Sequence, residues 1–237
     1  LYERFRVHAP VVEVTSIGAG GGSIAWIDPL TRTLHVGPDS AGSDPGPVCY
    51  GRGGTAPTVT DADVVLGRIS PENFFSGRQK LDREAALRAI EEKIAAPLGY
   101  DAIRAAKGIL EIVDMRMADL IRKLTVERGL DPRDFVLFSY GGAGPTHVGA
   151  YGREIGVPLA IVSPYAPVFS ALGIASSDVV RHYTKSEPMQ PPFDGARVEA
   201  VFKSIEARAL EDLERSRMRS GYEFSRSVSM RFRYQVH

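Results

Sequence analysis

The sequence has one cysteine, no net charge and no long apolar run, and each of these shortages excludes a class of protein. With Cys49 alone among 237 residues, no internal disulfide can form, and the chain fits a reducing compartment, so we expect it in the cytoplasm. The 29 basic residues are balanced by 29 acidic ones, without a basic stripe, which argues against nucleic acid as a partner. No stretch approaches the roughly 20 apolar residues of a membrane span, so we expect no membrane association.

Histidines at metal-ligand spacing are also missing. His8, His35, His182 and His237 show no such spacing, and Cys49 has no histidine partner that can be recognised, so a structural cysteine is the favoured interpretation. The hydrophobic share of 43% supports a packed core. A length of 237 residues allows one large domain or two small ones.

The most informative motif that is present is a glycine-rich turn at residues 141–144. An apolar run of strand character, 135–140, enters it, and Pro145 follows at a place suited to the first turn of a helix. Glycines in such a unit let a ligand approach the backbone, and the free N–H groups of the helix attract anions. By itself the motif fits a nucleotide-binding turn and an ordinary strand-to-helix connection equally well. The residues expected to contact a nucleotide are Gly141, Gly142, Ala143, Gly144 and His147.

A second glycine run, residues 18–23, stands between two short apolar segments, 11–14 and 24–27. Dinucleotide-binding and P-loop glycine runs open a helix, and the segment after this run has no helical character, so both of those sites are excluded. We expect instead a turn between two strands. A glycine hairpin can still wrap a phosphate group with its backbone N–H groups, and the expected contacts are Gly20, Gly21, Gly22 and Ser23.

Carboxylates and hydroxyls gather around a strand-like turn that contains Thr58, Thr60, Asp61 and Asp63. Mg²⁺ prefers hard oxygen ligands, so such groups near a triphosphate can hold the ion directly or through water. The alternative is that these residues stand here because Asp and Thr cap turns. We predict Asp61 as a catalytic residue, and Asp61 with Asp63 as magnesium ligands.

The composition changes along the chain and predicts an α/β fold in three parts. Residues 1–80 are rich in glycine, proline, threonine and aspartate, which indicates a β segment of short strands and ordered loops. Residues 81–188 are expected to form a helical and α/β lobe, in which a strand–helix–strand unit predicts a parallel pair. Residues 189–237 are expected to begin a C-terminal α+β region after a linker rich in proline.

Apolar periodicity places the main elements of these parts. Asp82 can cap a helix that ends near 97–99. The apolar residues of a longer helix, 101–128, cover most of its circumference and predict deep burial. A further helix, 198–213, is followed at 228–236 by alternating apolar and polar residues, which is typical of a half-buried strand.

Six stretches of the sequence resemble the hydantoinase A/oxoprolinase family. They follow the family's order from about residue 10 to about residue 185, and they are too long to be obtained easily by chance. The family includes N-methylhydantoinase A, 5-oxoprolinase and the ATP-binding subunits of acetone and acetophenone carboxylases. The stretches are 18–25, 40–54, 57–68, 127–132, 141–147 and 168–173.

The resemblance implies an ATP-dependent enzyme that activates a lactam, a cyclic imide or a ketone by phosphorylation, with ATP and Mg²⁺ as cofactors. It implies a fold similar to the actin, sugar-kinase and heat-shock ATPase superfamily (ribonuclease H-like), in which the turn at 141–144 lies against adenosine. His147 would then reach the ribose or the base; the alternative is a partly exposed helix residue. The implied partner is a second large subunit or domain of hydantoinase B type, in a hetero- or homo-oligomer.

The sequence also departs from the family pattern. The Asp-x-Gly-Gly-Thr phosphate turn that usually opens the family, and is repeated further along, is absent, and no aspartate precedes residues 20–23 at the needed offset. The strand expected at 228–236 has no partner in view and would leave an open edge. We therefore expect the later part of a longer subunit, which is inactive by itself.

From this pattern we expect an ATP-dependent amidohydrolase subunit that opens a cyclic amide, such as a hydantoin or 5-oxoproline. The first alternative is the ATP-binding subunit of a ketone carboxylase. An alternative of another class is a noncatalytic interaction module that keeps the fold without the nucleotide.

Overall fold

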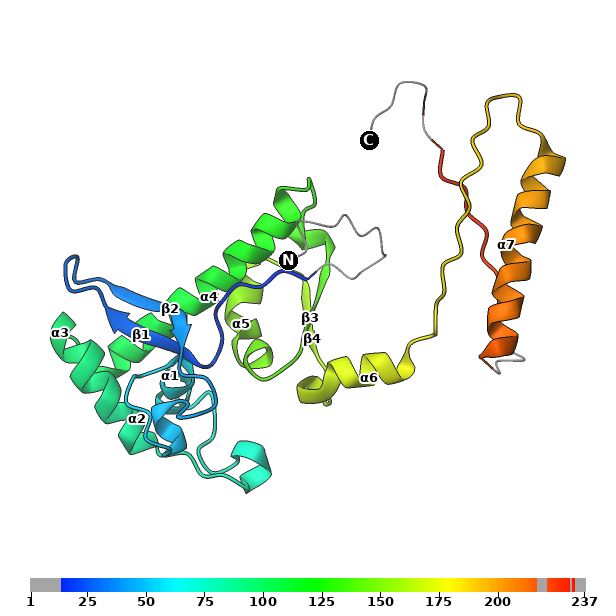
Figure 1. Cartoon of the computed structure of the whole chain (residues 1–237). Coiled ribbons are helices and arrows are strands. Elements are labelled where there is room, and N and C mark those ends of the chain that lie inside the picture. The colour runs from blue at the N-terminus through cyan, green and yellow to red at the C-terminus, as the bar shows by residue number, and fades with distance from the viewer. Residues whose placement is uncertain (1–13, 217–220, 231, 233–237) are drawn as a thin grey trace. The chain divides into compact units, whose positions relative to one another are not determined.

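The computed structural model describes residues 14–216, 221–230 and 232 (Figure 1). The chain divides into two compact units, one ending at Ser176 and the other beginning at Ser177. The domain boundaries expected near residues 80 and 188 stay predictions. Among the described residues, no helix combines the length and the apolar character that crossing a bilayer requires.

The first unit begins with an antiparallel hairpin, in which β1 (Ser23–Ile27) pairs with β2 (Leu34–Ser40). The glycine run thus leads into a strand, as expected, but the strand pairs with the segment that follows it. Of the strand expected at 11–14, only Val14 lies within the described residues, and it belongs to no strand. The register of β1 against β2 shifts between Ser23 and Ala25, next to the glycine run.

Short helices follow the hairpin, and two of them, α1 and α2, begin at a capping side chain. Thr58 caps α1 (Val59–Val65), and the Asp82 carboxylate accepts the Ala85 N–H at 2.8 Å at the start of α2 (Arg83–Ile90). A π-helical turn, Glu91–Ala95, carries α2 into α3 (Ala96–Leu98). This continuous segment confirms the helix expected from Asp82 to residues 97–99.

The long helix α4 (Ala102–Val126) confirms the helix expected at 101–128. The Asp101 carboxylate caps it by accepting the Arg104 N–H at 2.8 Å. The deep burial expected for this helix is confirmed over more than half of its circumference, while Ile103 and Met115 are 41% and 44% exposed. The buried residues of α4 are Ala105, Ala106, Ile109, Leu110, Val113, Asp114 and Ala118.

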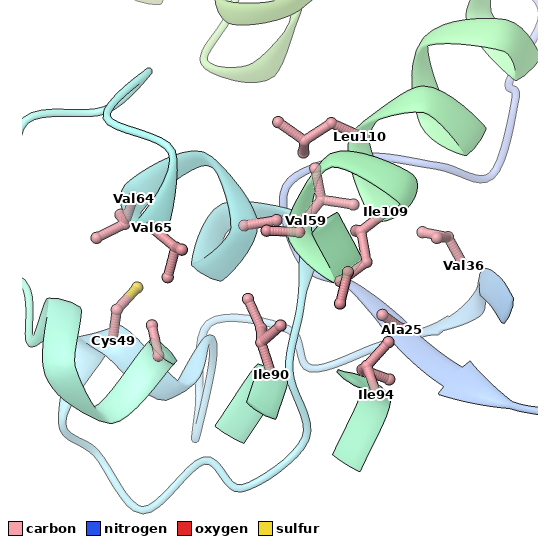
Figure 2. Packing of buried hydrophobic residues seen from close by; sticks show 14 of the residues in the cluster. Ala25, Val36, Cys49, Val59, Val64, Val65, Ile90, Ile94, Ile109 and Leu110 are labelled. Atoms are coloured by element: carbon pink, nitrogen blue, oxygen red, sulfur yellow. The ribbon is translucent and has the colours of Figure 1, made fainter. Parts of the chain in front are cut away.

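Two hydrophobic clusters hold the first unit together, and α4 contributes to both. Figure 2 shows the larger one, where Ala25 and Val36 of the hairpin, Val59 of α1 and Ile90 of α2 meet Ile109 of α4. The smaller cluster contains Ala118, Tyr151 and Ile155. Because α4 is a single rigid element, it fixes the hairpin and α1 relative to the helix that carries Tyr151.

The second sheet is the parallel pair that the sequence predicts. β3 (Val136–Ser139) and β4 (Leu159–Val162) are joined by α5 (Ala143–Ile155), which packs against α4. Leu137 and Val148 pack in the smaller cluster, whereas Val136 and Phe138 of the same strand are exposed. The helix α6 (Phe169–Ser176) ends the unit.

The second unit contains α7 (Gly195–Arg215), where the Asp194 carboxylate accepts the N–H groups of Ala196 and Arg197. This confirms the helix expected at 198–213. Residues 221–230 contain no helix or strand. The strand expected at 228–236 is therefore wrong for residues 228–230, which have no ladder partner, and most of its remainder lies outside the described residues.

Candidate functional site

The glycine run at 18–23 borders an open hollow of about 320 Å³. The Gly20 N–H donates to Ser23 Oγ at 3.0 Å, and the Ser23 N–H donates to the Gly20 carbonyl at 3.0 Å, which makes the turn tight. Backbone and serine hydroxyl groups form much of the wall, which suits a polar or anionic ligand. The lining residues are Ser16, Gly18, Ala19, Gly20, Gly22, Ser23, Pro38 and Ser40.

The three glycines of this turn have different reasons to be glycine. A Cβ atom on Gly21 would stand 2.6 Å from Thr60 Oγ1, and one on Gly22 would stand 2.7 Å from Ser40 Oγ. Packing against the buried Thr60 therefore requires glycine at position 21, whereas at position 22 the hydroxyl of the exposed Ser40 would have to rotate away. A Cβ atom on Gly20 would meet nothing within 4 Å, so Gly20 leaves free space at the hollow.

The turn at 141–144 connects β3 to α5, as the sequence predicts. Gly141 has a φ of +86°, which favours glycine, and its N–H donates to the Ala166 carbonyl at 2.8 Å. Ala143 and Gly144 are the first residues of α5. A Cβ atom on Gly144 would stand 2.9 Å from Ser139 Oγ, so glycine there lets the helix lie close to the strand.

Gly142 is the glycine of this turn that the fold does not require. Its backbone has helical angles, with φ −86° and ψ −58°, and it is exposed. A Cβ atom there would meet nothing within 4 Å. No side chain caps the start of α5 at this position, so the first N–H groups of the helix lie beside open space. This geometry allows a ligand to approach the backbone closely.

Asp61 is fully buried and binds four donors of the chain itself. Its carboxylate accepts the N–H groups of Val48 at 3.1 Å, Cys49 at 2.7 Å and Thr58 at 2.8 Å, and the Thr58 hydroxyl at 2.8 Å. These are the contacts of a capping residue, the alternative that the sequence left open. A catalytic role for Asp61 stays a prediction.

The structure gives Asp61 and Asp63, the predicted magnesium ligands, contacts within the chain itself. The Asp61 carboxylate is surrounded by the donors of the capping network, and Asp63 faces His147. No group of three or more His, Cys, Asp or Glu side chains in the described part of the chain could hold a metal ion. Their role as magnesium ligands therefore stays a prediction.

A buried cluster of charged side chains joins α1, α4 and α5. His147 of α5 is fully buried, with Nδ1 2.6 Å from Asp114 Oδ1 of α4 and Nε2 3.3 Å from Asp63 Oδ2 of α1. Arg68 Nη1 lies 3.4 Å from Asp114 Oδ2 and 3.3 Å from His147 Nδ1. The contact with Asp114 is a hydrogen bond, whereas Nε2 and Asp63 Oδ1 have no hydrogen-bond partner among the described residues.

The two aspartates keep the buried imidazole charged. Burial lowers the pKa of His147, but the contacts with Asp114 and Asp63 and their negative charges raise it more, to about 9. At neutral pH the ring is therefore protonated on both nitrogens, and Nδ1–H donates to Asp114. The cluster then contains two carboxylates and two cations, so its charges balance.

This placement gives His147 a different set of contacts from those expected. Its ring lies between Asp63 and Asp114 instead of at the surface of the turn, and a contact with a nucleotide stays a prediction. The role of Asp114 was missed from the sequence. The available signal was one acidic residue in the apolar stripe of the helix at 101–128, since a buried carboxylate needs a partner.

Cys49 is buried beside Asp61. Burial raises the pKa of the Cys49 thiol far above its ordinary value, and the negative charge of Asp61 raises it further. The thiol therefore stays protonated, and a protonated thiol is a poor nucleophile. This chemistry agrees with the structural cysteine favoured by the sequence.

The first unit is thus an α/β unit with two glycine turns, one beside an open hollow and one at an uncapped helix start. Comparison with known families gives its class. The model of the family described as Hydantoinase/oxoprolinase matches residues 1–183. The chain belongs to the hydantoinase/oxoprolinase family, which confirms the resemblance seen in the sequence.

Three relatives show what this chain is similar to. It is 50% identical over 187 residues to the acetophenone carboxylase gamma subunit of Aromatoleum aromaticum, covering 79% of this chain and 25% of that protein. It is 44% identical over 187 residues to caprolactamase subunit alpha of Pseudomonas jessenii, covering 79% and 27%. A solved relative is the nucleotide-free structure of acetone carboxylase, whose description names ATP-dependent acetone carboxylation. It matches with a TM-score of 0.70 and 36% sequence identity, covering 83% of this chain and 29% of that one.

The chain spans about a quarter of the length of the curated relatives it matches, 25% and 27%. Both of these relatives are named as subunits, so they belong to assemblies of more than one chain. Homologues of this chain are ATP-dependent.

Proposed function

We propose that this chain is the nucleotide-binding region of an enzyme that uses ATP to activate a carbonyl group. The observation that carries the proposal is the free space at Gly142, beside the uncapped start of α5. It supports adenosine binding at the turn 141–144. The hollow at Gly20 supports phosphate binding by the glycine run 18–23. The α/β unit and the ATP-dependent relatives agree with a fold of the actin, sugar-kinase and heat-shock ATPase type (ribonuclease H-like).

When bound, ATP supplies a phosphoryl group that makes a carbonyl oxygen a better leaving group. For the full-length protein we propose a cyclic amide as substrate, with hydrolytic ring opening, and the similarity to caprolactamase supports this choice. The second candidate is carboxylation of a ketone, which the 50% identity to an acetophenone carboxylase subunit favours.

The proposal extends to the surroundings of the enzyme. Mg²⁺ accompanies ATP, a second large subunit or domain of hydantoinase B type shares the chemistry, and the assembly is cytoplasmic. The relatives named as subunits support a multi-chain assembly. Residues 1–80, 81–188 and 189–237 are three segments of one larger subunit in this proposal.

The substrate class is tested by phosphate release from ATP. The full-length protein with its large partner subunit is given 5-oxoproline, hydantoins, caprolactam, or a ketone with bicarbonate. We expect a cyclic amide to stimulate release and to be opened in the same reaction. Stimulation by a ketone with bicarbonate alone would select the carboxylase instead. No stimulation in a folded assembly that binds no nucleotide would favour the noncatalytic interaction module.

The adenosine turn is tested by Gly142→Val. Nothing lies within 4 Å of the Cβ position, so we expect the fold to accommodate the substitution, while the isopropyl group fills the space beside the start of α5. We expect the Kd for Mg·ADP, measured by calorimetry on the full-length protein, to rise about tenfold or more, equivalent to about 1.4 kcal/mol.

Gly149→Ala is the matched control for this substitution. Gly149 lies on the same helix, is exposed, and has equally free space around its Cβ position, but it lies beyond the first turn. We expect its affinity to stay within about twofold of the wild type. Unchanged affinity in folded Gly142→Val would contradict adenosine binding at this turn.

A further inference from the structure

Helix α1 contacts the glycine run 18–23 of the proposed nucleotide site directly, and it contacts α5, the helix that follows the turn 141–144, through His147. In the first turn of α1, Thr60 binds the glycine run 18–23 through two donors. Its N–H and its hydroxyl donate to the Gly21 carbonyl at 2.8 Å and 2.9 Å. The fit is close, since a Cβ atom on Gly21 would stand 2.6 Å from Thr60 Oγ1. Thr60 is buried, so the glycine run 18–23 is fixed to α1 by one backbone and one side-chain hydrogen bond.

One helical turn later, α1 contacts α5. Asp63 and Thr60 are three residues apart and therefore lie on neighbouring positions of the helix surface. Asp63 Oδ2 is 3.3 Å from Nε2 of His147, and both side chains are buried. Asp63 Oδ1 has no hydrogen-bond partner among the described residues, so the protonated His147 is the group that compensates this buried carboxylate.

His147 transmits this contact to the turn 141–144. It lies in the second turn of α5, after Gly142 at the helix start, and backbone hydrogen bonds keep that short stretch rigid. Asp114 of α4 holds the same ring from its other nitrogen, at 2.6 Å. A sliding movement of α5 would separate buried opposite charges, so the start of α5 is held in place relative to α1.

We propose that Thr60, Asp63 and His147 are positioning residues that fix the distance between the two glycine turns through α1. The nucleoside end of a nucleotide lies at one turn and its phosphates at the other, so this brace makes the two ends bind together. The inference rests on the proposed function, because it concerns the ligand of the same site. It adds that the gain in affinity from the phosphates depends on residues that do not touch the nucleotide.

The test compares two ligands in each variant of the full-length protein. Adenosine contacts only the turn 141–144, whereas ATP spans both turns. In Asp63→Asn, which keeps the shape and removes the charge, we expect the Kd of adenosine to change by less than about threefold. We expect the Kd of ATP to rise by about tenfold or more both with Mg²⁺ and with EDTA, so the ratio of the adenosine Kd to the ATP Kd falls in both conditions. A fall confined to the Mg²⁺ condition would overturn the inference, because it would make Asp63 a magnesium ligand instead.

Thr60→Val acts at the other end of the brace. It removes the hydrogen bond from the Thr60 hydroxyl to Gly21 and keeps the one from the backbone N–H. We therefore expect Thr60→Val to fold, and it replaces Asp63→Asn if that variant does not fold. We expect the same fall in the ratio, by about threefold or more. Asp119→Asn is the matched control, because Asp119 is an exposed aspartate of α4 whose ion pair is with Arg122, and its ratio should equal that of the wild type.

Loss of affinity for adenosine and ATP by the same factor in the folded variants would overturn the inference, since it would mean local damage to one turn. An unchanged ratio in both variants would also overturn it. If the wild type binds neither ligand, or if Gly142→Val leaves binding intact, the proposed function itself fails. The failures of the two proposals are therefore distinguishable.

Discussion

Replacing Asp61 by alanine is expected to destabilise the region around α1 by about 3 to 5 kcal/mol. The substitution removes the acceptor of four hydrogen bonds and leaves the N–H groups of Val48, Cys49 and Thr58 unpaired in a buried place. It also breaks the capping box in which Thr58 and Asp61 bind each other at the start of α1. The structure thus predicts a stability defect before any loss of catalysis.

Cys49 is the natural probe for this effect, because it lies beside Asp61 and its buried thiol is unreactive. Labelling of the Cys49 peptide by a thiol reagent, followed by mass spectrometry, reports opening of the region within the full-length protein. We expect labelling of Asp61→Ala to be faster by about two orders of magnitude or more. Asp119→Ala, an exposed aspartate of α4, should be labelled at the wild-type rate.

The same experiment decides between the two interpretations of Asp61. Asp61→Asn retains one acceptor oxygen and should show a smaller increase in labelling than the alanine variant. A catalytic Asp61 would give the opposite pattern, with wild-type labelling and no turnover in Asp61→Asn. That pattern would restore the role predicted from the sequence.

Removing the charge of His147 is the second substitution with a large expected effect. The pKa of His147 in the folded protein is about 9, above its ordinary value of 6.5. Its contribution to stability is therefore complete below pH 6.5 and is lost as the pH rises through 9. The difference between these two pKa values corresponds to about 3 kcal/mol of folding free energy. A neutral ring would leave Asp63 and Asp114 with less positive charge between them.

We expect the melting temperature of the full-length protein to fall between pH 6.5 and pH 9.5, and His147→Gln to lose much of this dependence. His147→Gln should also be less stable than the wild type at pH 6.5, because two buried carboxylates lose their shared cation. Subtracting the variant's pH dependence from that of the wild type removes the contribution of other groups, such as the Cys49 thiol, which ionises in this pH range only in the unfolded chain. Equal slopes for both proteins would contradict a charged His147.

Several elements of the fold could be predicted from the sequence because their causes are local. The stripe of apolar residues gives α4, and Asp82 and Asp101 cap α2 and α4 by contacts three residues along the chain. The strand, glycine turn and helix around 141–144 follow in the same way. Residues 228–230 show the limit of local prediction, because they belong to no strand although apolar and polar residues alternate there. Such alternation gives a strand only where a neighbouring strand supplies the hydrogen bonds.

The candidate site could be predicted only in part. Its two glycine turns were located, but the sequence did not distinguish Gly21 and Gly22, where a Cβ atom would lie 2.6 and 2.7 Å from a neighbouring hydroxyl, from Gly20 and Gly142, where it would meet nothing within 4 Å. That difference depends on Thr60 and on other residues brought close by folding.

The sequence by itself determined the family, the two glycine turns and the main helices, because these depend on contiguous residues. Only the tertiary structure decided what the buried polar groups do. Asp61 receives donors from residues 12 and 13 positions away, and His147 meets an aspartate 33 positions away. A buried charge is stable only beside the partners that folding brings to it, and no local pattern specifies which partners these are.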